Sequence, residues 1–249
     1  MKKFVILISI LGLIYEIKAQ DVSDGKRELT NAEQLYRIDD VLNNRNIVSD
    51  SKYEGVQGSS LIFDKYLPGK VIVNDSTITS ESVLMNIDAI ADEVRFKTPN
   101  KPERALNNSK FLGVQMTDEN GKSYIFKRFR VYEKAFGNAL VQIISETNEL
   151  TFVKLIQKQF RRADYENRGV TSTGKPYDSF FTTTNYYVKK ENHLFKKIRL
   201  LKNEIIGLAP PEKFQDLEKL CRDHHIGTKL DENEAAALIK TIESLTVSH

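Results

Sequence analysis

Short runs of apolar and β-branched residues, each followed by turn-forming residues, recur between residues 58 and 201 and restrict the chain to a sheet-rich fold. Val83–Asp88 and Val94–Lys97 form one pair of such runs, and Ala139–Ile144 and Leu150–Phe160 form another. Runs of this length and composition are typical of β-strands. No helical crossover is visible between them, and parallel strands would need one. We therefore expect strands that pair antiparallel with their neighbours in sequence.

Two turn signals predict particular hairpins. Pro68-Gly69 lies between Leu61–Phe63 and Val71–Val73. Proline followed by glycine suits the two central positions of a β-turn, so we expect a hairpin here that opens the sheet. Asn120-Gly121 lies between two further runs, and Asn-Gly is among the better short-range hairpin signals.

A last pair of runs, Phe180–Val188 and Leu194–Leu201, follows a polar loop at residues 162–178. It brings the total to nine or ten strands in successive hairpins. We predict a mainly β (α+β) fold over residues 58–206, an antiparallel β-meander curled into a half-barrel or sandwich.

Residues 207–249 change to the period of helices. Pro210-Pro211 ends the strands, and apolar residues then recur at helical spacing up to Cys221. Asp231 and Glu234 match a capping box that begins a second helix. We expect a C-terminal αα-hairpin that packs its apolar stripe on the sheet.

The first 19 residues have the form of an export signal. Lys2 and Lys3 precede an apolar run of about 11 residues, which is shorter than the roughly 20 needed to span a membrane. Ala19 suits the position before cleavage. An uncleaved anchor or a buried strand is the alternative. We expect a periplasmic or secreted protein that is not an integral membrane protein after signal removal.

Residues 20–57 read as a polar leader with one short helix. Thr30 and Glu33 match a capping box, and a narrow apolar stripe continues as far as Leu42. We expect this helix over about residues 30–43. The polar residues that follow it predict a linker to the sheet.

Charge and cysteine content exclude several functions. Loss of residues 1–19 lowers the formal net charge from +3 to about +1, so no global charge favours nucleic acid. Cys221 is the only cysteine, which excludes an intramolecular disulfide. Because no cysteine directly follows the apolar run, a lipoprotein anchor is not expected either.

Catalytic, metal and cofactor sites have little support in the sequence. Cys221, Asp223 and His225 could face one ion, but a closed zinc site wants a fourth donor, and we predict no metal and no cofactor. No nucleophile motif is present, so we predict no catalytic residues. A carboxylate-dependent hydrolase of envelope or host polymers stays as the alternative. Its candidate acids are Asp88, Asp92, Glu93, Asp178 and Glu191.

Basic and aromatic residues interleave in two of the expected strands. On one exposed sheet face they would form a surface able to bind an anionic glycan or a nucleic acid. Export makes nucleic acid the weaker choice. A half-buried strand produces the same alternation without any ligand. The candidate ligand-binding residues are Tyr124, Lys127, Arg128, Arg130, Tyr132, Lys154 and Lys158.

Four short motifs resemble a group of uncharacterised exported proteins of Bacteroidota. They lie at Tyr53–Ser59, Lys65–Val71, Asp92–Lys97 and Asn185–Val188. The resemblance covers most of the chain after the leader. It implies a β-rich protein of the cell envelope and supplies no activity and no site residues.

These observations favour an exported, non-catalytic cell-envelope protein that acts as a binding or interaction module. Its expected partner is an envelope protein, a glycan or a lipid, and not a nucleic acid.

Overall fold

The computed structural model describes residues 53–73, 76–98, 102–106, 111–129, 136–147, 149–167, 172–190 and 193–246. All of them belong to one compact unit, Arg37–His249. The predicted export signal, the predicted helix at residues 30–43 and Glu191 lie outside the described residues.

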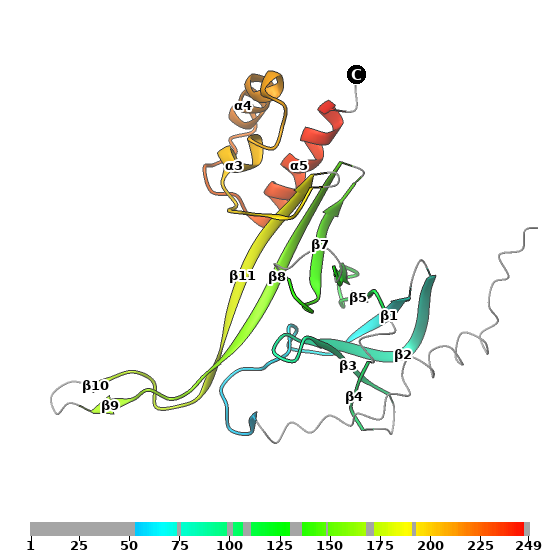
Figure 1. Ribbon diagram of the computed structural model, residues 1–249, viewed down its shortest axis with the longest axis vertical. Coiled ribbons are helices and arrows are strands. Elements are labelled where there is room, and N and C mark those ends of the chain that lie inside the picture. Colours follow the sequence, from blue (N-terminus) through cyan, green and yellow to red (C-terminus); the bar gives the residue numbers. More distant parts are fainter. Residues whose placement is uncertain are drawn as a thin grey trace, which may run out of the picture. The chain divides into compact units, whose positions relative to one another are not determined.

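Ten strands form one open antiparallel sheet in the order β12-β11-β8-β7-β6-β5-β1-β2-β3-β4. This confirms the predicted mainly β fold, with strands that pair with their neighbours (Figure 1). The strands of this sheet are β1 (Leu67–Val73), β2 (Ser76–Asp88), β3 (Glu93–Lys97), β4 (Arg104–Ala105), β5 (Gly113–Thr117), β6 (Ser123–Lys127), β7 (Val141–Glu146), β8 (Leu150–Arg161), β11 (Ser179–Lys190) and β12 (Lys196–Ile198).

The strand order departs from a simple meander at one place. β1 to β4 follow each other across the sheet, but β5 then returns to pair with the opposite edge of β1. This long return places β1 in the interior of the sheet. Strand pairs that are adjacent in sequence were predictable from their turns, whereas the return connection has no local signal.

The predicted hairpin around Pro68-Gly69 is wrong, because both residues lie inside β1. The pairing with β2 shifts register between Pro68 and Lys70, and a bulge is one of the few places where a strand accepts proline. A Cβ on Gly69 would lie 2.8 Å from Sδ of Met85. Proline and glycine therefore serve an irregular, tightly packed strand here.

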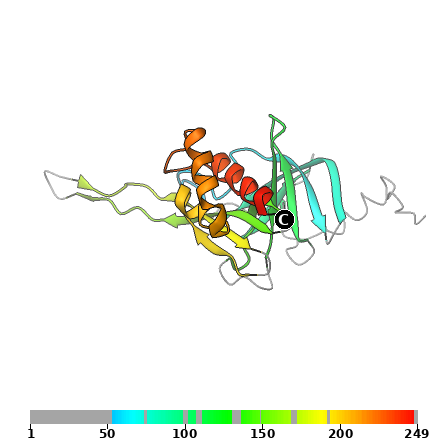
Figure 2. The same ribbon diagram turned by 90° about the horizontal axis from the view of Figure 1, so that it is seen from above.

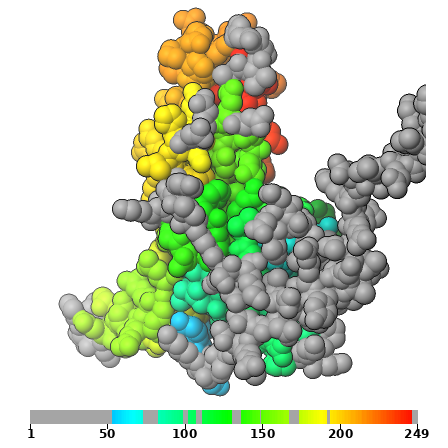
Figure 3. Space-filling view, turned by 45° about the vertical axis from the view of Figure 1, so that its right-hand side comes forward, coloured from blue at the N-terminus to red at the C-terminus, as the bar shows by residue number. Residues whose placement is uncertain are grey.

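The long β8–β11 hairpin continues past the main sheet. Where we expected only a polar loop, a small second sheet pairs β9 (Glu166–Asn167) with β10 (Ser172–Thr173). β8 and β11 run side by side from the helices to this tip (Figure 1). In the space-filling view the yellow-green atoms of the tip lie far from the orange and red helices (Figure 3).

The C-terminal helices gather over one end of β8 and β11 (Figure 2). They are α3 (Lys202–Ile206), the 3-10 turn η2 (Pro211–Lys213), α4 (Phe214–Asp223) and α5 (Glu232–Thr246). The predicted helix pair corresponds to α4 and α5, while α3 was not predicted. Cys221, Ile239 and Phe152 belong to the apolar cluster that joins the helices to the sheet, and all three are fully buried.

The two faces of β8 pack into different cores. Leu150 and Phe152 face the helices, while Val153 and Leu155 face a second cluster on the other side that contains Phe136. A third cluster fills the half of the sheet formed by β1 to β6. The alternation of β8 is therefore that of a strand covered on both faces over its first half.

Candidate functional site

Three polar side chains lie in one row across the sheet. Lys154 of β8 is directly opposite Gln142 of β7 on one side and Tyr186 of β11 on the other. Directly opposed residues of antiparallel strands point to the same face. That face is the one on which α5 packs, so the row leads toward the first turn of this helix.

Glu232, the first residue of α5, closes the row. Its Oε2 lies 2.7 Å from Nζ of Lys154 and accepts a hydrogen bond of 3.1 Å from the Tyr186 hydroxyl. Burial, together with the negative charge and hydrogen bond of Glu232, raises the pKa of Tyr186 to about 12. Lys154 therefore balances the charge of the Glu232 carboxylate within the protein.

The predicted capping box fixes where α5 begins. Oδ1 of Asp231 accepts the Glu234 N–H at 2.8 Å, and Oε2 of Glu234 accepts the Asp231 N–H at 2.8 Å. This reciprocal pair satisfies two main-chain donors at the helix start. Glu232 and Asn233 are therefore held in the first turn.

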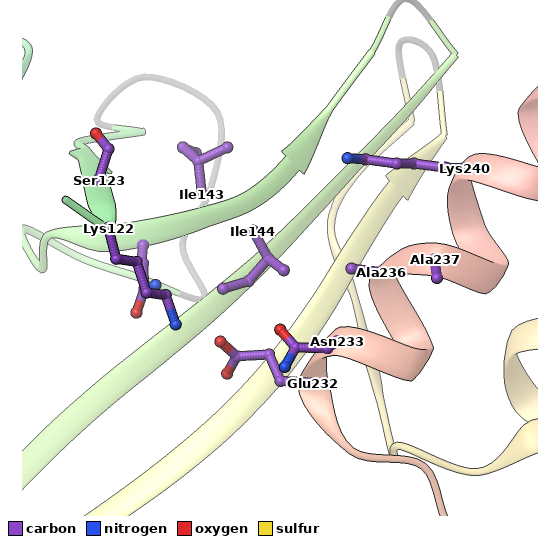
Figure 4. Close-up of a pocket in the computed structure, with 10 residues that line it drawn as sticks. Lys122, Ser123, Ile143, Ile144, Glu232, Asn233, Ala236, Ala237 and Lys240 are labelled. Carbon is purple, nitrogen blue, oxygen red and sulfur yellow. The ribbon is translucent and has the colours of Figure 1, made fainter. Parts of the chain in front are cut away.

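A groove of about 340 Å³ lies between this turn of α5, β7 and the start of β6 (Figure 4). Ile144 and Ala236 give it apolar walls, and Gln142 and Asn233 add amide groups that can donate or accept hydrogen bonds. Its lining consists of Lys122, Ser123, Gln142, Ile143, Ile144, Glu232, Asn233, Ala236, Ala237 and Lys240.

Two lysines carry the charge that the groove presents. Lys122 enters from the start of β6 and Lys240 from the third turn of α5 (Figure 4). Neither makes an ion pair with another residue that the structure describes. Nζ of Lys122 lies 5.2 Å from the ring centre of Tyr124, whose hydroxyl donates to Asp118. The nearby charges of Asp118 and Glu243 act on Lys122 and Lys240, respectively, but neither carboxylate lines the groove. Because Lys154 balances Glu232, the lining itself has an excess of positive charge.

The predicted basic and aromatic residues do not form a single surface. Tyr124 and Lys154 lie on the groove side of the sheet. Lys127 is directly opposite Val141, whose side chain packs into the core of the other face, and its ammonium pairs with Glu146. Arg130 and Tyr132 lie outside the described residues.

Arg128 and Lys158 donate hydrogen bonds to main-chain carbonyls of distant segments. Nη2 of Arg128 donates to the main-chain oxygen of Asp92 at 2.6 Å, and the residue as a whole is 7% exposed. Nζ of Lys158 donates to the carbonyl of Ser59 at 2.8 Å and to that of Leu61. Burial lowers the pKa of Lys158. Both residues link segments that are distant in sequence.

The carboxylates of the hydrolase alternative have structural partners. Oδ1 of Asp88 accepts the N–H groups of Ile90 and Ala91, and Oδ2 accepts the Ser60 hydroxyl and pairs with Arg95. Asp178 accepts the N–H of Ala163. Among the candidate acids that the structure describes, Asp88, Asp92, Glu93 and Asp178, none lines the groove.

Sequence reasoning missed Glu232, Lys240 and Gln142. A signal existed for the helical half: Glu232, Ala236 and Lys240 recur every four residues, which places them on one face of a helix that begins at the predicted capping box. The partner strand could not be deduced, because β7 meets α5 only through tertiary packing.

Comparisons of the chain with protein-family models, with curated proteins and with solved structures gave no match. Within the described residues, no group of three or more His, Cys, Asp or Glu side chains is arranged to hold a metal ion. No helix in the described part of the chain is long and apolar enough to cross a membrane.

Proposed function

We propose that this chain is an exported, non-catalytic protein of the cell envelope that binds a ligand in the groove between β7 and α5. The observation that carries the proposal is the charge arrangement: Lys154 and Tyr186 satisfy Glu232, while Lys122 and Lys240 keep their charge toward the groove. The location rests on the export signal and the resemblance to exported proteins of Bacteroidota that we expect from the sequence.

The lining favours an acidic saccharide as the ligand. Two ammonium groups can bind a carboxylate or phosphate, and the amides of Gln142 and Asn233 can bind sugar hydroxyls. The volume of about 340 Å³ lies at the lower end of the range for small-ligand sites. One or two sugar units are therefore the expected size.

Titration of the purified chain with digalacturonate, followed by calorimetry, tests this function. The double change Lys122→Gln and Lys240→Gln should weaken binding about a hundredfold or more, since each lost charged hydrogen bond contributes about 1.5–3 kcal/mol. Lys219→Gln, an exposed lysine of α4, serves as the matched control and should leave affinity unchanged. Neutral digalactose should bind much more weakly than digalacturonate. Equal binding of both sugars, or equal affinity in the double variant, would overturn the proposal.

A further inference from the structure

The edge of β11 that faces away from β8 is paired only at its two ends. Near its beginning, Gln57 forms a parallel bridge with Ser179. Near its end, Tyr186, Tyr187 and Val188 pair with β12. Between them, from Phe181 to Asn185, no strand of the described residues pairs with this edge, although β8 pairs with the other side throughout.

The hydrogen bonds of Gln57 show which main-chain groups point outward. The Phe180 N–H donates to the carbonyl of Gln57, and the Gln57 N–H donates to that of Asp178. Because alternate residues of a strand direct their main-chain groups to the same edge, Thr182 and Thr184 also point outward. Each presents one N–H and one C=O to this gap.

Side chains along the gap lack the features that protect sheet edges. Natural edges carry charges, proline or bulges that prevent pairing with another chain. The sequence Phe-Thr-Thr-Thr-Asn at 181–185 has none of these, and its register with β8 is regular. Phe181 is 56% exposed, the second most exposed of the large apolar side chains described. β12 differs, since two of its three residues are lysines.

We infer that this gap is a site where a short extended segment of a partner polypeptide adds to the sheet as one strand. An extended backbone is the chemistry that satisfies the outward groups of Thr182 and Thr184. The gap spans five residues, which limits the added strand to about that length. This inference concerns a different surface from the groove and does not depend on the saccharide proposal.

The neighbouring side chains favour an uncharged segment. Lys158, directly opposite Thr182, already donates its ammonium to the carbonyls of Ser59 and Leu61. Phe181 lies directly opposite Gln159, and Thr183 lies opposite Gln157. An added strand would place its alternate residues beside this aromatic, hydroxyl and amide row. Aromatic or β-branched residues suit that position best, because cross-strand pairs of these types stabilise sheets.

A second copy of this chain does not fit the gap. Symmetric antiparallel pairing about Thr183 would bring residues 186–188 of one chain beside residues 178–180 of the other. Gln57 already occupies the edge at residues 178–180, and β12 occupies it at residues 186–188. The unpaired stretch of residues 181–185 is therefore too short for two copies of β11 to pair with each other.

The test uses the full chain and the synthetic peptide acetyl-Phe-Thr-Thr-Thr-Asn-amide, an uncharged strand former. Amide hydrogen exchange is followed by NMR with and without the peptide. The N–H groups of Thr182 and Thr184 should slow about tenfold or more at saturation, as new hydrogen bonds form. Those of Phe181 and Thr183, which face β8, should not change.

Thr184→Pro removes one outward N–H at an edge position where proline is tolerated, and it should weaken peptide binding about tenfold. Thr184→Val keeps the N–H and the β-branched shape, so it is the matched control and should bind within about twofold. Thermal unfolding of both variants establishes that they fold. Unchanged exchange at Thr182 and Thr184, or undiminished binding by the proline variant, would overturn the inference. So would protection of the edge by dimerisation without peptide.

Discussion

The hydroxyl of Thr147, in the turn between β7 and β8, donates a hydrogen bond to the carboxylate of Glu243, which lies 96 residues later in α5. Thr147 also bonds with the main chain of Leu150, so it fixes the turn and the helix together. Glu243 is buried on the sheet side of α5, close to the apolar cluster that contains Ile239 and Ile242.

Burial is the main cause that raises the pKa of Glu243. The Leu150 N–H and the charge of Lys240 act in the opposite direction, and the charge of Glu149 adds to the rise. The protonated form of Glu243 is therefore favoured by folding. This contribution to stability is complete below the unfolded pKa, near the ordinary value of 4.5, and is lost as the pH rises through the folded pKa. At neutral pH the ionised carboxylate lowers the free energy of unfolding.

Glu243→Gln should accordingly raise the free energy of unfolding at pH 7, by roughly 1 kcal/mol, because the amide keeps an acceptor for Thr147 without a charge. The gain should shrink as the pH falls below the unfolded pKa. Urea unfolding at pH 7 and pH 4 measures it, with the exposed Glu218→Gln of α4 as control. A destabilised Gln variant at pH 7 would contradict this account.

The pKa of Tyr186 is sensitive to the negative charge of Glu232 at the start of α5. Its pKa of about 12 arises first from burial and then from Glu232, so Glu232→Gln should move it back toward 10.0. Because the folded pKa exceeds the unfolded one, the tyrosine's contribution to stability is present below pH 10 and lost as the pH rises toward 12. Ultraviolet titration of phenolate formation checks this by comparing the parent chain with Tyr186→Phe. A pKa for Tyr186 that is insensitive to Glu232→Gln would contradict the geometry of the row.

Glycines in the sheet should differ in how well they accept a methyl group. A Cβ at Gly113 would lie 2.2 Å from the carbonyl oxygen of Phe126, which is fixed by the sheet, whereas at Gly69 it meets the flexible end of Met85. Gly113→Ala should cost about 3 kcal/mol or more and Gly69→Ala about 1–2 kcal/mol, as expected for overpacked cores. As a comparison outside the sheet, a Cβ on Gly227, in the loop between α4 and α5, would meet its nearest atom at 3.6 Å, so Gly227→Ala should cost least. Urea unfolding of the three variants gives the order, and a reversed order of Gly113 and Gly69 would refute it.

Local patterns account for most of the elements and for little of their assembly. The hairpin at Asn120-Gly121 was predicted correctly. Its turn needs a residue with positive φ, and Gly121 adopts φ 79° without strain because it has no side chain. Pro68-Gly69 has equally strong turn chemistry but serves a bulge, since β5 packs beside β1 from a distant part of the sequence. Local propensity cannot distinguish these two uses of glycine.

For the groove, too, local patterns predicted an element but not how the elements assemble. The capping box at Asp231 and Glu234 located the first turn of α5 from sequence alone. Lys127 and Arg128 were chosen for their charge, yet one lies on the opposite face and the other is buried against a carbonyl. Strand alternation gives the relative face of two residues in one strand, but which face is covered depends on where the C-terminal helices pack.

The most buried charges of the sheet allow a last prediction. Arg95 is 4% exposed and pairs with Asp88, which is 1% exposed. Asp88→Ala would remove the main partner of a buried guanidinium and also uncap the turn at Ile90 and Ala91. Breaking such a pair costs about 3–5 kcal/mol.

Lys97→Met provides the matched control on the same strand. Its ammonium lies 3.3 Å from Glu103 but is half exposed, so its loss should cost about 1 kcal/mol or less. A double change of Asp88→Asn and Arg95→Met should recover part of the loss, because the two most buried charges are then removed together. Glu103 keeps Lys97 as its partner. Urea unfolding of each variant, together with the single changes Asp88→Asn and Arg95→Met, measures the coupling. If Asp88→Ala cost no more than Lys97→Met, Asp88 would not be the structural anchor that its four contacts indicate, and the hydrolase alternative would regain a candidate acid.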